Sequence, residues 1–170
     1  MTPDPVVRLQ SVIHTLEHVI VPAVDATNLL AVEQCGVTLA QLQMLLAHLP
    51  LIEDYHRSCA DDIADTVNAL PEAAGGARTL AAAAAVSGIA GAGARSGGDR
   101  LFYHDVGRAV DALLRAVAAD GNAGYRAKVE KSIFAFSRRQ SLRSRAWFRD
   151  SGFDPDPASL PPITDLIASN

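Results

Sequence analysis

The hydrophobic positions of residues 27–70 repeat with helical spacing and form two apolar faces. One stripe advances in steps of three and four residues, and the other repeats every seven residues. We predict a long central helix from Thr27 to Leu70, bent at Pro50, because proline removes a helical hydrogen bond. A helix with two apolar faces must lie centrally or bury one face against a partner chain. The first stripe comprises Val32, Cys35, Leu39, Leu42, Leu46 and Leu49, and the second Leu30, Val37, Met44 and Leu51.

Four further segments carry helical signals, whereas no segment shows the sustained alternation of apolar and polar residues that is typical of a strand. The sequence therefore predicts an all-α fold, a bundle of four to five helices over residues 1–152. The four segments are Val6 to Val21, Ala77 to about Ala90, Asp99 to about Ala119, and Asn122 or Ala123 to about Phe148.

Two segments of low helical content interrupt or follow this bundle. The glycine- and alanine-rich residues 87–98 are expected to form a flexible loop, or, with the alanine run before them, a disordered linker over residues 77–98. The proline-rich residues 153–170 are expected to be an extended tail that packs on the bundle. Its apolar anchors would be Phe153, Leu160, Ile163, Leu166 and Ile167.

Composition narrows the class of protein. The chain is 49% hydrophobic but only 5% aromatic, so its core consists mainly of small aliphatic side chains, which favour close packing of helices. No uninterrupted apolar run of about 18 residues or secretory signal pattern is present, so we expect a cytoplasmic protein that does not enter a membrane. Cys35 and Cys59 lie about 36 Å apart if their helix is straight, too far for a disulfide.

Charge is distributed very unevenly along the chain. Residues 1–75 contain ten acidic and two basic residues, whereas residues 76–149 contain five acidic and thirteen basic ones. The net charge of −4 therefore conceals an acidic first half and a basic second half. We expect helices of opposite charge to face each other, within one chain or across an interface.

Glu53 and His56 form the most specific candidate site. A Glu and a His three residues apart share one helical face, and this motif resembles the Glu-x-x-His ligand pair of ferritin-like di-iron and di-manganese proteins. The resemblance is limited to these residues, since the chain contains no second Glu-x-x-His. It implies a metal-binding site at Glu53 and His56. An enzyme that uses these two residues could also involve Tyr55 and Cys59, which lie on the same helical segment. The alternative is a buried histidine with a structural hydrogen bond.

His14, Glu17 and His18 form a second group of potential metal ligands. If Val6, Leu9, Ile13, Leu16 and Ile20 define the packed seam of the first helix, both histidines lie on or beside its outer face. Such residues could form a metal site only at the surface or at an interface.

The basic segment from Arg126 to Arg149 has eight Lys or Arg residues and one acidic residue. We expect ion pairs with the acidic helices, but the segment could instead bind an anionic ligand such as a phosphate of the coenzyme A type. Nucleic acid is a less favoured partner, because the sequence pI is near 5.7. The candidate ligand-binding residues are Arg138, Arg139, Arg143 and Trp147.

The patterns favour a non-catalytic helical accessory protein that acts through oligomerisation or partner binding. The second apolar face of Thr27 to Leu51 predicts a homo-oligomer, most simply a dimer, and leaves room for a different protein partner. The alternatives are an enzyme that uses Glu53 and His56 with a small ligand or a metal, and a binder of anions. The sequence identifies no cofactor.

Overall fold

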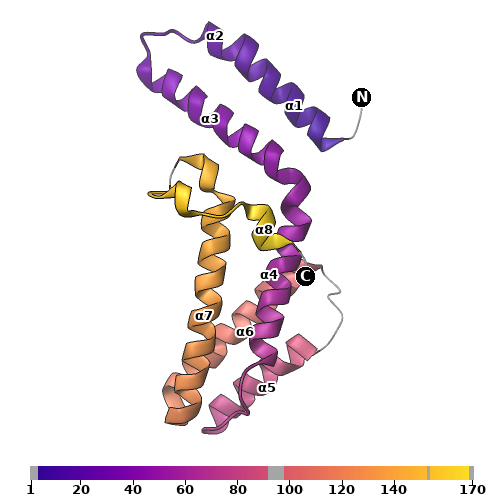
Figure 1. The fold of residues 1–170 in the computed structure, drawn as a ribbon, viewed down its shortest axis with the longest axis vertical. Coiled ribbons are helices and arrows are strands. Elements are labelled where there is room, and N and C mark those ends of the chain that lie inside the picture. Colours follow the sequence, from indigo (N-terminus) through magenta and orange to yellow (C-terminus); the bar gives the residue numbers. More distant parts are fainter. Residues whose placement is uncertain (1–3, 92–97, 153, 169–170) are drawn as a thin grey trace. The chain divides into compact units, whose positions relative to one another are not determined.

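The computed structural model describes residues 4–91, 98–152 and 154–168 of the chain. Within these ranges every regular element is helical and no strand is formed, so the all-α prediction is confirmed (Figure 1). The described residues fall into two compact units. The hairpin unit consists of the residues up to Ile52 together with Phe148–Ser159, and the core unit consists of Glu53–Trp147 and the residues from Leu160 onward.

The first rod of the hairpin unit is helical from residue 5 to residue 23. It comprises α1 (Pro5–Thr15), a π-helical turn η1 (Leu16–Ile20) and the short α2 (Val21–Ala23). The carboxylate of Asp4 caps it by accepting a hydrogen bond of 2.9 Å from the amide of Val6. The rod therefore begins close to where the sequence predicts and continues two residues beyond the predicted end at Val21.

The second rod, α3 (Leu29–His48), runs antiparallel to α1 and packs beside it (Figure 1). Asn28 caps it, since its side-chain oxygen accepts a hydrogen bond of 3.2 Å from the amide of Ala31. The seam between the rods is shallow. Ile13 is the buried hydrophobic residue of this unit, and none of the residues of α3 is buried.

Pro50 interrupts the long central helix, as predicted. After His48 the backbone tightens into a 3₁₀ turn, η2 (Leu49–Leu51), and then continues as α4 (Ile52–Asn68). The 3₁₀ turn fits the loss of the hydrogen bond that the proline nitrogen cannot donate. α3 belongs to the hairpin unit, and α4 from Glu53 belongs to the core unit.

The core unit contains α4, α5 (Ala77–Gly91), α6 (Asp99–Asp120) and α7 (Ala123–Trp147). The alanine-rich α5 packs closely along α6, because small side chains let two helices approach. The four helices enclose one apolar cluster, made of Ile63, Val67, Val86, Val106, Val110, Leu113, Val117, Tyr125 and Val129.

A compact joint at Asp120 holds the start of α5 against the end of α6. The Asp120 carboxylate accepts hydrogen bonds from the amides of Arg78 and Thr79, both 3.0 Å, and from the Thr79 hydroxyl at 2.6 Å. These bonds hold the pKa of Asp120 below its usual value. A Cβ at Gly75 would lie 2.9 Å from the carbonyl oxygen of Asp120, so only glycine fits this approach.

The predicted loop at residues 87–98 needs correction. Residues 87–91 are not a loop, since α5 continues to Gly91; the rest of the expected loop, residues 92–97, lies outside the described residues. The next helix, α6, begins at Asp99, where the sequence predicts it. Alanine propensity outweighs the two isolated glycines of α5, each of which costs about 1 kcal/mol in a helix.

The tail also differs from the uniformly extended segment that we expected. It contains a 3₁₀ turn, η4 (Pro157–Ser159), and a short helix, α8 (Ile163–Ile167), which begins directly after Pro162. Two predicted anchors, Leu160 and Ile167, are buried, while Phe153 lies outside the described residues. Proline disfavours the helical conformation of the residue before it but is compatible with a helix that starts just after it.

Leu113 tests the apolar cluster, because its side chain is fully buried at the centre of α6. We expect Leu113→Ala to lower the free energy of unfolding by about 2–5 kcal/mol through lost burial and a residual cavity. Chemical denaturation followed by circular dichroism measures this change. Leu101→Ala, at an exposed position of the same helix, should change stability by less than about 0.5 kcal/mol. Equal effects would contradict the packing described.

Candidate functional site

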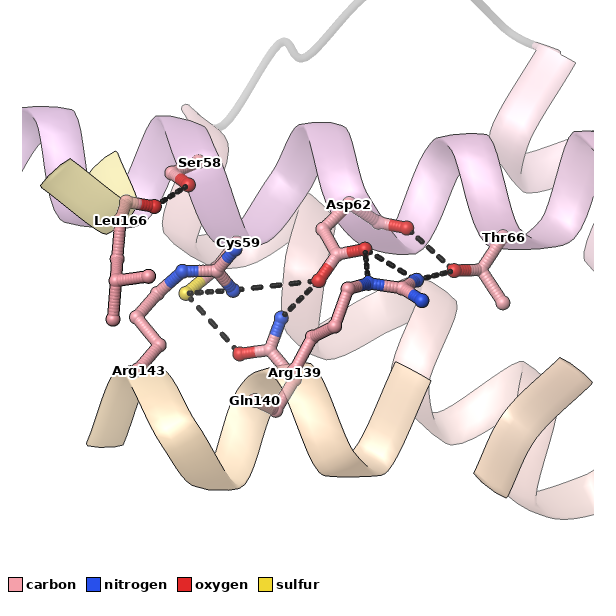
Figure 2. Close-up of polar contacts among 8 residues, drawn as sticks. All are labelled: Ser58, Cys59, Asp62, Thr66, Arg139, Gln140, Arg143 and Leu166. Atoms are coloured by element: carbon pink, nitrogen blue, oxygen red, sulfur yellow. Dashed lines mark hydrogen bonds and ion pairs between the residues drawn. The ribbon is translucent and has the colours of Figure 1, made fainter. Parts of the chain in front are cut away.

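Asp62 on α4 is the centre of a polar network that joins α4 to α7 (Figure 2). Arg139 donates to its Oδ1 atom through Nε at 2.8 Å and Nη2 at 2.6 Å, and the same Nη2 donates to the Thr66 hydroxyl at 3.0 Å. Gln140 donates to Oδ2 at 3.1 Å, and Arg143 donates to Oδ2 at 3.4 Å. The expected pairing of acidic and basic helices within one chain thus converges on a single carboxylate.

Arg143 is the unusual member of this network. Arg143 is only 7% exposed, and its Nε atom has no hydrogen-bond partner. Arginine is charged at every accessible pH, so Asp62 supplies the counter-charge that burial requires. The network therefore has an evident structural role, which is to hold α7 against α4.

Cys59 and Tyr55 lie on the same side of α4 as this network. The Cys59 thiol donates to Oε1 of Gln140 at 3.5 Å, and burial raises its pKa despite the nearby Arg143 guanidinium. The ring of Tyr55 packs on Trp147 with centroids 4.5 Å apart, and burial raises the pKa of its hydroxyl. A protonated thiol beside a protonated phenol is typical of side chains that pack in a core. A catalytic nucleophile would instead need a neighbouring base to activate it.

Glu53 and His56 occupy different environments despite sharing a helix. Glu53 is exposed, whereas His56 is half-buried near Arg100 and His104 of α6. Burial lowers the pKa of His56 below its usual value, Arg100 and His104 act in the same direction, and Asp99 opposes them. No group of three or more His, Cys, Asp or Glu residues in the described part of the chain is arranged to hold a metal ion.

His14, Glu17 and His18 are all exposed on the first rod of the hairpin unit. The two imidazole rings meet edge to face, with centroids 4.3 Å apart. This contact matches the outward orientation that the seam predicts for both histidines, and it leaves Glu17 as a surface carboxylate.

The arginines of α7 lie on two different faces. Arg138 and Arg139 border an open surface hollow of about 530 Å³, together with Arg145. Arg143 faces the core, and Trp147 packs on Tyr55, so the four candidate ligand-binding residues do not form one site. Arg145 was not among those candidates, although its seven-residue spacing from Arg138 was a signal that it shares that residue's face. Ala135, Ser141 and Leu142 complete the hollow.

The hairpin unit has an extensive apolar surface that packing within the chain does not cover. Leu29 is 77% exposed and Leu30 is 68% exposed, far above what a packed helix shows. Both belong to α3, whose only Asp, Glu, Lys or Arg residue is Glu33. The other large exposed hydrophobic residues of the unit are Val7, Val12, Val19, Ile20, Val32, Val37, Leu45, Ile52 and Phe148.

The chain covers one end of α3 by itself. The 3₁₀ turn η3 (Arg149–Ser151) lies against the C-terminal end of α3, beside a small hollow of about 270 Å³ lined by Met44, His48 and Asp150, among others. Burial lowers the pKa of His48, opposed by the Asp150 carboxylate. The predicted second face is therefore partly covered near Met44 and open near Leu30 and Val37.

Comparison with known protein families, with characterised proteins and with solved structures finds no match to this chain. By length and composition alone, residues Leu29–Asn68 include a stretch apolar enough to cross a membrane, and none of that stretch is buried. A helix that packs against other helices passes the same test of length and composition. The functional argument therefore rests on the chemistry of the surfaces.

Substitutions of Asp62 and of Arg143 should lower stability by different amounts, and this difference tests the network. We expect Asp62→Asn to destabilise the protein by about 3 kcal/mol, because it leaves the buried Arg143 charge without its counter-ion. Arg143→Met should cost less, since Asp62 keeps Arg139 and Gln140 as donors. Urea denaturation of both variants measures the difference, and an Arg143→Met variant less stable than Asp62→Asn would contradict this assignment.

The lowered pKa of His56 predicts a pH dependence of stability. The unfolded chain binds a proton at this histidine more readily than the folded protein, so stability should fall as the pH decreases from about 7 to 5. His56→Gln should make that fall smaller, although His48, shifted in the same direction, will preserve part of it. Denaturation of both proteins at the two pH values tests this, and an unchanged pH dependence in His56→Gln would refute it.

Proposed function

We propose that this protein is a non-catalytic interaction protein whose hairpin unit associates with the hairpin unit of a second copy. One observation carries the proposal: α3 has 20 residues, is largely apolar, and has no buried residue. Each large apolar side chain left in water forgoes about 1.5–3 kcal/mol of burial free energy. The exposed leucines and valines of this unit therefore favour a state in which another surface covers them.

The geometry of a helical hairpin explains why one copy is insufficient. Two antiparallel helices can bury only the stripes that face each other, and α3 has apolar residues on a second face as well. Two such hairpins can pack together as a four-helix bundle, which encloses stripes from all four helices. Association would thus provide the apolar core that the hairpin unit lacks.

The size of the surface is adequate for a stable dimer. A helix of 20 residues is about 30 Å long, and two helices side by side are roughly 20 Å wide, which gives a flat footprint on the order of 600 Å². Standard interfaces bury about 800 Å² of accessible surface on each partner, and side chains make the accessible area larger than the footprint.

The chemistry of α3 favours a protein partner over the interior of a membrane. Its surface carries Glu33 and three exposed glutamines, Gln34, Gln41 and Gln43. These groups would be desolvated at high cost in hydrocarbon but can remain at the hydrated rim of a helical interface. The helix also contains Gly36, where a Cβ would meet no atom of the chain within 4 Å, so another backbone has room to approach.

The test is the oligomeric state of the full chain measured by sedimentation velocity. We expect the wild type to be a dimer at about 10 µM, and Leu30→Glu with Val37→Glu to weaken self-association at least about 100-fold, because two carboxylates would be buried in the interface. Circular dichroism confirms that the variant remains helical.

The matched control is Leu101→Glu, which places the same charge at an exposed leucine of the core unit. It should leave the dimer intact. A wild type that is monomeric throughout the micromolar range, or a control that dissociates the dimer as strongly as the hairpin variant, would disprove the proposal.

A further inference from the structure

The outer face of α7 carries a regular row of cations. Lys131, Arg138 and Arg145 are spaced seven residues apart, so they lie nearly in line along the helix, about 10.5 Å from one to the next. The buried residues Tyr125 and Val129, together with Arg143, define the opposite face, which packs in the core unit. The row therefore points away from the core.

Apolar side chains interleave with this row. Phe134 is 67% exposed and Leu142 is 37% exposed, and both follow the same outer face. The open hollow of about 530 Å³ begins at Ala135 and runs along the row to Arg145. The face thus combines positive charge with an apolar strip, as do helical surfaces that receive an amphipathic helix.

Two of the three cations in this row have no ion pair with a neighbouring acid among the described residues. Glu130, the one acidic residue of α7, binds Arg126 at 2.7 Å, and Arg139 is committed to Asp62. Among the described residues, Lys131 and Arg138 form no ion pair. Their charge is therefore available to an external partner.

We propose that the outer face of α7, formed by Lys131, Phe134, Arg138, Leu142 and Arg145, binds an acidic amphipathic helix of a partner protein. Carboxylates that repeat every seven residues on such a helix would match the cation spacing, because both follow the same helical period. Leucine-like side chains between them would cover Phe134 and Leu142.

Two other occupants fit this face less well. A second α7 would bring cations against cations, so the face does not support self-association. A small anion would be held by the flank of a single helix, whereas pockets for small ligands enclose most of the ligand surface. The proposal concerns the core unit and is independent of pairing between hairpin units.

The experiment measures binding of a labelled synthetic helical peptide to the full chain by fluorescence anisotropy. The peptide has glutamate at every seventh position with leucines between, and a scrambled peptide of identical composition serves as its control. We expect saturable binding of the first peptide, weakened at least about tenfold between 50 and 300 mM salt. The scrambled peptide should bind at least about tenfold more weakly.

Variants locate the binding surface. Lys131→Glu with Arg138→Glu should reduce the affinity at least about tenfold without changing the oligomeric state. Arg108→Glu, at an exposed arginine of α6 whose side chain is 81% accessible, should change it less than about twofold. The proposal is overturned if the peptide does not bind at 1 mM, if the scrambled peptide binds equally well, or if vesicles containing phosphatidylserine bind and the peptide does not.

Discussion

Burial on both apolar faces of α3 is the requirement on which the rest of this account depends. α1 can cover only one of those faces, and the turn at Arg149–Ser151 reaches only the C-terminal end of the other. The N-terminal part, with Leu29, Leu30 and Val37, remains in water in the single chain. Because the hydrophobic effect scales with apolar area, a surface of this kind is a strong reason for association. We infer that the hairpin unit attains its full stability when it is paired.

The core unit buries its own apolar helix faces without a partner, and it does so mainly with small side chains. Alanines of α5 allow close packing on α6, and a valine-rich cluster fills the space toward α4 and α7. One charged group, Arg143, is buried with it and is compensated by Asp62. Such a network adds little net stability compared with apolar residues of similar size, but it strongly disfavours arrangements that separate its members. This argues that Asp62, Gln140 and Arg143 specify how α4 and α7 pair.

Much of the fold follows from sequence periodicity, whereas the environment of each polar residue does not. The three-and-four spacing predicted α1, α6 and α7 closely, and Pro50 marked the break between α3 and α4, because these features depend on residues near in sequence. The convergence of Arg139, Gln140 and Arg143 on Asp62 depends on the rotation of two helices about their axes, which local patterns leave open. For the same reason the motif of Glu53 and His56 could not reveal that Arg100 and His104 approach the histidine. The expectation of an extended tail missed the short helix α8, which starts just after Pro162, where proline is compatible with a helix.

The most direct test of the central claim is amide hydrogen exchange in α3 as a function of protein concentration. If a second copy covers this helix, its amides should be protected at high concentration and should exchange at least about tenfold faster after dilution below the dissociation constant, while amides of α6 remain unchanged. If α3 exchanges at the same rate at every concentration, no second copy protects it, and the proposed association of the hairpin unit is wrong.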